Sequence, residues 1–191
     1  MGTPTLAAPP RGLRAATHGS ATRVTGQDRT GASSWSFREE DSRRITSILN
    51  EFLRVSRART ALIVDRNGQM IATVGEQTSF DPLAFASLTA ADFSANDQLA
   101  RLIGEPEFGS LFHQGEKDSM YLADIARRVI LVVLFDNQTT LGLVKLRVKS
   151  AVGSLNHVFI EMQAREEAGA NRVESGFLGD AEDEIDRLFG E

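Results

Sequence analysis

The seven-residue run VILVVLF, from Val129 to Phe135, constrains the fold of this chain more than any other stretch. The run is far shorter than the roughly 18 apolar residues that a membrane span needs. Its length is typical of a buried strand. A buried strand requires a sheet with other elements packed on it, so we expect the rest of the chain to supply further strands and covering helices.

The rest of the chain shows the spacing of further helices and strands. Apolar residues recur at three- and four-residue intervals from Phe37 to Val55, which predicts an amphipathic helix. An Asn-Gly turn at 66–68 predicts a hairpin, and Asp81-Pro82 and Gly104 mark the start and end of a second helix. Strands are expected at 60–65, 69–74, 119–125, 129–136 and 141–149, and a third helix at 150–167.

These elements predict an α/β (α+β) domain over residues 37–167, in the order α-β-β-α-β-β-β-α. Short polar links between the strands favour a five-stranded, mostly antiparallel sheet with helices on its faces. The strand at 119–125 is expected at an edge of the sheet, where it needs covering or pairing. We therefore expect a homodimer.

The second helix carries two different faces. At about 100° per residue, one face collects residues that we assign to the core: Ala84, Leu88, Ala91, Ala95, Leu99 and Leu102. Phe93 falls on the opposite side beside Ala86 and Ala90, and Ser87, Ala90 and Ser94 form a stripe of small residues. An aromatic side chain beside small residues is typical of an interface anchor, although scattered surface phenylalanines are common. We favour a contact surface around Phe93.

The two ends of the chain carry opposite charges. Residues 1–36 are basic, rich in small residues and poor in large apolar ones, so we expect a disordered arm; an organelle transit peptide is the alternative. Residues 166–191 hold nine acids and two arginines. In the acidic linker and tail at 168–191, Ile185, Leu188 and Phe189 have helical spacing. This predicts a short helix that folds when it docks in a groove, or one that packs on its own domain.

The sequence lacks the residue patterns of a catalytic centre. It contains no cysteine, and its three histidines are not at metal-ligand spacing. Motifs for phosphate cradles, dinucleotides and activated nucleophiles are absent. The net charge of −5 favours neither nucleic acid nor a membrane surface as a partner. We expect no cofactor, no metal and no membrane span, and a cytoplasmic binding module rather than an enzyme.

Several long stretches are similar to a known family. The segments ASLTAADFSANDQLARLIGE (86–105), FHQGEKDSMYL (112–122) and VILVVLFDNQTTLGLVKLRVK (129–149) resemble the bacterial gliding-motility members of the Roadblock/dynein light chain family. The resemblance runs from about Ile45 to Met162, and the terminal DEIDRLF is similar as well.

This resemblance implies a Roadblock-type fold with the element order given above. It implies a homodimer that joins its sheets edge to edge and brings the two second helices together. The implied partner is a small Ras-like GTPase of the MglA type, one per dimer. Such members stimulate GTP hydrolysis without inserting an arginine, by realigning the catalytic groups of the GTPase, and their C-terminal helix favours nucleotide exchange. The implied role is control of cell polarity, at a cell pole.

Two sets of site residues follow from the resemblance and the helix faces. The family presents a small-residue surface of the second helix to the GTPase, and here Phe93 and Asp97 add bulk and charge to it. The expected GTPase-binding residues are Ala86, Ala90, Phe93, Ser94, Asp97, Gln98, Ile185, Leu188 and Phe189. The expected dimer-interface residues are Ser87, Ala90, Ser94, Arg101, Met120 and Leu122.

Two other functions remain open on the sequence alone. One is an adaptor, a Roadblock homodimer that scaffolds other polarity proteins without affecting GTP hydrolysis. The other is a small-molecule sensor, which is disfavoured because no polar groups converge on an evident pocket.

Overall fold

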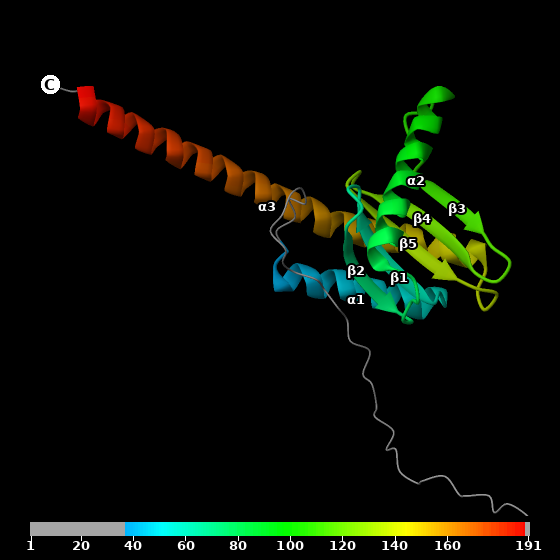
Figure 1. Cartoon of the computed structure of the whole chain (residues 1–191). Coiled ribbons are helices and arrows are strands. Elements are labelled where there is room, and N and C mark those ends of the chain that lie inside the picture. Colours follow the sequence, from blue (N-terminus) through cyan, green and yellow to red (C-terminus); the bar gives the residue numbers. More distant parts are fainter. Residues whose placement is uncertain (1–36, 190–191) are drawn as a thin grey trace, which may run out of the picture.

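The computed structural model describes residues 37–189 of the chain, with side chains described through residue 168. Three helices and five strands follow one another in the predicted order (Figure 1). They are α1 (Glu39–Ser56), β1 (Thr60–Asp65), β2 (Met70–Gly75), α2 (Pro82–Leu102), β3 (Ser110–Gln114), β4 (Ser119–Ile125), β5 (Val129–Phe135) and α3 (Leu141–Phe189). The predicted N-terminal arm, residues 1–36, lies outside the described residues.

The five strands form one antiparallel sheet in the order β2-β1-β5-β4-β3. β1 and β5 pair along their whole lengths at its centre. Successive residues of a strand point to opposite faces, and on both central strands both sets are buried. Ile63 and Leu131 belong to the core under α1 and α3, whereas Leu62 and Val132 belong to the core under α2. This two-sided burial accounts for the uninterrupted apolar run of β5.

Helices α1 and α3 pack together on one face of the sheet (Figure 1). Arg44 in the first half of α1 donates to Glu161 of α3 at 2.5 Å. The hydroxyl of Thr139, just before α3, donates to the carbonyl of Ser56 at the end of α1 at 2.6 Å. The two helices therefore run antiparallel.

The structure corrects the predicted strand at 141–149, which is the first part of α3. The hydroxyl of Thr140 accepts a hydrogen bond from the amide of Leu143 at 3.3 Å and so caps the new helix. Val144 and Val148 are buried one helical turn apart. Over this short stretch leucines alternate with basic residues, which is the pattern of a strand. Val144 breaks that alternation and fits the spacing of a helix.

The fifth strand is β3, which the sequence assigned to a connecting segment. It pairs with β4 along its length and forms one edge of the sheet. Its signal is weak because Leu111 and Phe112 are its only large apolar residues. The segment predicted to be an edge strand, 119–125, is β4 and lies between β5 and β3.

Helix α3 continues without a break to Phe189 and projects away from the sheet (Figure 1). The sequence indicated an acidic linker after residue 167 and a separate short helix. One continuous helix spans both, because the glycines in this segment weaken a helix without the obligatory break that a proline imposes. Side chains beyond residue 168 lie outside the described part.

Helix α2 covers the opposite face of the sheet with the side that contains Phe93, which the sequence predicts to be exposed. Phe93 is fully buried against the sheet, in one cluster with Leu62 and Leu122. Ala86 and Ala90 are buried on the same side of α2. The prediction that Phe93, Ala86 and Ala90 form an exposed contact surface is therefore wrong.

The predicted core stripe of α2 faces outward instead. The exposed fractions of Leu88, Leu99 and Leu102 are 70%, 57% and 81%. The sequence predicts a core position for these leucines because they recur on one side of the helix. This prediction is wrong: helical spacing identifies the two faces of α2 but not which of them packs on the sheet.

Close packing explains why α2 adopts this orientation. Ala86 and Ala90 let the helix backbone approach the sheet, and Phe93 fills the space that remains between them. The β1–β2 hairpin also touches the helix, because a Cβ atom at Gly68 would lie 2.9 Å from the Cα atom of Ser87. Gly68 has φ +85°, a conformation that favours glycine.

We expect Phe93→Ala to lower the free energy of unfolding by about 3–5 kcal/mol, because it removes a fully buried ring and leaves a cavity. Urea unfolding followed by circular dichroism measures this change. Leu146→Ala is the matched control: its side chain is 62% exposed on α3, so we expect a change within about 0.5 kcal/mol. Equal effects of the two substitutions would contradict the burial of Phe93.

Candidate functional site

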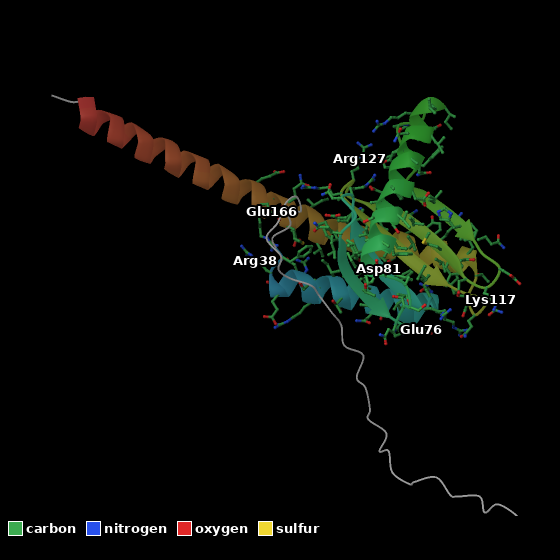
Figure 2. All side chains as sticks on the ribbon, in the orientation of Figure 1. Arg38, Glu76, Asp81, Lys117, Arg127 and Glu166 are labelled. Atoms are coloured by element: carbon green, nitrogen blue, oxygen red, sulfur yellow. The ribbon has the colours of Figure 1, made fainter. Side chains whose placement is uncertain are left out.

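Helix α2 begins at an N-cap that the sequence predicted. The carboxylate of Asp81 accepts a hydrogen bond from the amide of Leu83 at 3.1 Å, and Pro82 occupies the first helical position. Asp81 is labelled at the start of α2 in Figure 2. From this fixed start the helix crosses the sheet, and its far end extends beyond the strands (Figure 1).

One arginine side chain ties the second half of α2 to the sheet. Arg66 follows the last residue of β1, and its guanidinium donates to Asp97 of α2 at 2.5 Å and to Asp124 of β4. The same guanidinium lies over the ring of Phe93, 4.7 Å from its centroid. We call Arg66, Phe93, Asp97 and Asp124 the arginine clasp. Sequence reasoning missed Arg66, because no local pattern relates the residue after an antiparallel strand to the middle of the next helix.

The partners of Arg66 in the clasp favour the charged form of its guanidinium. Burial lowers the pKa of Arg66, but its hydrogen bonds to Asp124 and Asp97 raise it, and the pKa lies above its ordinary value. Asp97 is therefore engaged within its own chain. The expectation that Asp97 adds an exposed charge to the partner surface is wrong, because its carboxylate accepts a hydrogen bond from Arg66.

The outer face of α2 carries two adjacent stripes. The first is apolar and consists of Leu88, Leu99 and Leu102, with exposed alanines between them. We call these three leucines the leucine stripe. The second stripe is small and polar, and its members Ser87, Ser94 and Gln98 are exposed.

The edge strand β3 lies on the same side of the molecule as α2. His113 of β3 and Asp92 of α2 form a hydrogen bond of 2.7 Å between their side chains. This hydrogen bond ties α2 to the edge strand, whose outer backbone groups pair with no other strand among the described residues.

The other predicted site residues have mixed positions. Leu122 is fully buried in the core under α2, so its expected place at a dimer interface is wrong. Met120 is half-buried on β4, and Arg101 is exposed near the end of α2. Ile185, Leu188 and Phe189 belong to the last turns of α3, where side chains lie outside the described part.

The described residues lack the patterns of metal sites and membrane-spanning helices. Among them no cluster of histidines and acidic residues could hold a metal ion. No helix in the described part has the length and apolar character that crossing a membrane requires. The arrangement on α2 is suited to binding another protein.

Comparison with protein families and solved structures agrees with this geometry. The Roadblock/LC7 domain family matches residues 45–135. The structure of MglB from Myxococcus xanthus is 41% identical, with a TM-score of 0.63, and the match covers 66% of this chain and 95% of that one. A gliding protein MglB from Thermus thermophilus is 31% identical, with a TM-score of 0.65, and the match covers 69% of this chain and 99% of that one.

Two further comparisons add context. An MglB structure described as having a tetrameric arrangement is also 31% identical, with a TM-score of 0.65 and coverage of 69% of this chain and 99% of that one. Comparison with curated protein sequences gives no match. The match to nearly the full length of two MglB proteins, together with the shared fold, establishes that this chain belongs to the Roadblock/LC7 family and is MglB-like.

Proposed function

We propose that this protein is a homodimeric regulator of a small Ras-like GTPase of the MglA type, that it stimulates GTP hydrolysis, and that it acts in cell polarity. The observation that carries the proposal is 41% identity across 95% of Myxococcus xanthus MglB. The outer face of α2 supports it, because this face offers a surface for a second copy beside a surface for a GTPase.

The leucine stripe is the surface for the second copy. Three leucines exposed on one helix face are costly in water and are typical of an interface. The free edge of β3 lies on the same side and can pair with the β3 of the second copy, which removes the unpaired edge. Burying both features in one contact accounts for an apolar outer face on a helix whose inner face already fills the core.

The small polar stripe is the surface for the GTPase. Ser94 and Gln98 are exposed, and small side chains allow close approach of a partner backbone. Phe93 and Asp97 had suggested that bulk and charge disrupt this surface. Both side chains instead contact Arg66 on the inner side of the helix. The outer surface therefore keeps the small side chains expected of a GTPase-binding helix.

Stimulation through such a surface requires no catalytic group from this chain. The GTPase supplies the nucleotide site and the residues that orient the attacking water. A rigid helix pressed against its mobile segments can hold those residues in the reactive arrangement, which lowers the entropic part of the barrier. The dimer thus acts by positioning.

The leucine stripe predicts a specific loss of dimerisation. We expect Leu88→Glu combined with Leu99→Glu to give a monomer, because the two charges would be buried unpaired in the interface. Light scattering at micromolar concentration measures the mass. The matched control is Leu146→Glu with Ile160→Glu, two residues exposed on α3, which should remain dimeric. A dimer in both double variants would show that α2 is not the interface.

The small polar stripe predicts a specific loss of GTPase stimulation. We expect GTP turnover by an MglA-type GTPase to rise when this protein is added, and Ser94→Arg to weaken binding by about 2 kcal/mol or more through steric bulk. Leu146→Arg on α3 introduces the same side chain away from α2 and should leave turnover unchanged. Binding without any rise in turnover would instead identify the protein as an adaptor. Normal stimulation of GTP turnover by the Ser94→Arg variant would show that α2 is not part of the GTPase-docking surface.

We extend the proposal to the C-terminal part of α3. Its acidic sequence and the spacing of Ile185, Leu188 and Phe189 suit docking on the GTPase and promotion of nucleotide exchange. Deletion of residues 176–191 should slow the release of a fluorescent nucleotide from the GTPase and keep most stimulation of hydrolysis. Equal release with and without these residues would exclude the tail from the nucleotide cycle.

A further inference from the structure

The second half of α2 has little apolar attachment to the sheet. Of its residues after Phe93, only Asn96 and Ala100 are buried. Asn96 donates to the carbonyl of Phe108 at 3.3 Å, a contact with the loop that follows α2 rather than with a strand. The direction of this half of the helix therefore depends largely on polar contacts.

The arginine clasp supplies those contacts from three parts of the fold. The guanidinium of Arg66 bonds Asp97 of α2 and Asp124 of β4 and covers the ring of Phe93. The backbone amide of Arg66 also donates to the carbonyl of Arg128, in the β4–β5 turn, at 3.1 Å. The side chain is thus held at its base by the sheet while its far end holds the helix.

We propose that Arg66 is the positioning residue for the GTPase-facing surface of α2, holding Ser94 and Gln98 in the orientation that stimulates hydrolysis. The inference rests on the proposed function. Asp97, which bonds Arg66, is adjacent to Gln98 and three residues from Ser94. About one turn of the helix therefore carries both the residue that Arg66 holds and the two residues that face the GTPase. A change in the clasp changes the angle at which this turn meets a partner.

The shape of arginine suits this position. Its planar, two-branched head donates to two carboxylates and stacks on an aromatic ring at the same time. A lysine keeps the charge but lacks the planar head. Loss of arginine also leaves Asp97 and Asp124 as neighbouring like charges, which repel each other and push α2 away from β4.

The chain offers a matched control in Arg59. Arg59 precedes β1 whereas Arg66 follows it, so the two arginines flank the same strand. Arg59 also bonds two carboxylates, those of Glu76 and Asp118, each at 2.7 Å, but it has no contact with α2 among the described interactions. Arg59→Met therefore removes a second arginine that bonds two carboxylates, at the other end of the strand and without a contact to α2 among the described interactions.

The test compares Arg66→Met, Arg66→Lys, Asp97→Asn and Arg59→Met in the full-length protein. Light scattering and circular dichroism first establish which variants remain folded dimers; Asp97→Asn preserves side-chain shape in case Arg66→Met does not fold. GTP turnover by an MglA-type GTPase is then titrated with each variant. The rate at saturation reports orientation, whereas the concentration at half-saturation reports affinity.

We expect Arg66→Met to reduce the saturating rate by about fivefold or more, since small displacements of positioning groups have large effects on rate. The saturating rates with Arg66→Lys and Asp97→Asn should lie between those of Arg66→Met and the wild type. The rate with Arg59→Met should lie within about twofold of the wild type, because substitutions of surface residues usually have small effects. A saturating rate for Arg66→Met or for Asp97→Asn equal to that of the wild type would overturn the proposal.

Hydrogen exchange separates failure of the clasp from failure of the proposed function. If the wild-type protein gives no stimulation, the proposed function fails, and amide exchange over residues 91–102 decides the role of the clasp. Exchange there should be about tenfold faster in Arg66→Met than in the wild type and unchanged in Arg59→Met, because loss of a local tie raises local opening. Unchanged exchange in Arg66→Met would overturn positioning of α2 by Arg66.

Discussion

The burial of Phe93 between α2 and the sheet determines which face of α2 is exposed to solvent. With the ring turned inward, Ala86 and Ala90 follow it and the helix lies close to the strands. The leucine stripe then faces outward, because it lies on the side of the helix opposite Phe93. Burial of a single ring thus creates both the filled core and the exposed apolar face, and it provides the platform on which Arg66 lies.

Much of the fold could be predicted from the sequence because its signals are local. The Asn-Gly turn, the Asp81-Pro82 cap and the apolar run of β5 each depend on neighbouring residues, and each is confirmed. The orientation of α2 could not be predicted in this way. Both of its faces contain apolar residues, and the choice between them depends on how well each fits the sheet, which is a property of strands distant in sequence.

Errors in the strand assignments have a similar origin. The first turns of α3 alternate apolar and basic residues, and the short edge strand β3 has almost no apolar pattern. Hydrogen-bond partners decide both cases: Thr140 caps a helix, and β4 offers an edge to β3. The site was predictable only in part for the same reason. Ser94 and Gln98 are exposed as expected, whereas the inward roles of Phe93 and Asp97 depend on Arg66, from a different element.

We propose a regulator that works by shape, with one face of α2 for a second copy and the adjacent face for a GTPase. In this proposal a dimer, not a single chain, stimulates hydrolysis. The most direct measurement is the rate of GTP hydrolysis by a fixed, high concentration of an MglA-type GTPase as this protein is added. We predict that the rate rises and reaches its plateau at one dimer per GTPase. A plateau at one chain per GTPase, or no rise at any ratio, would contradict it.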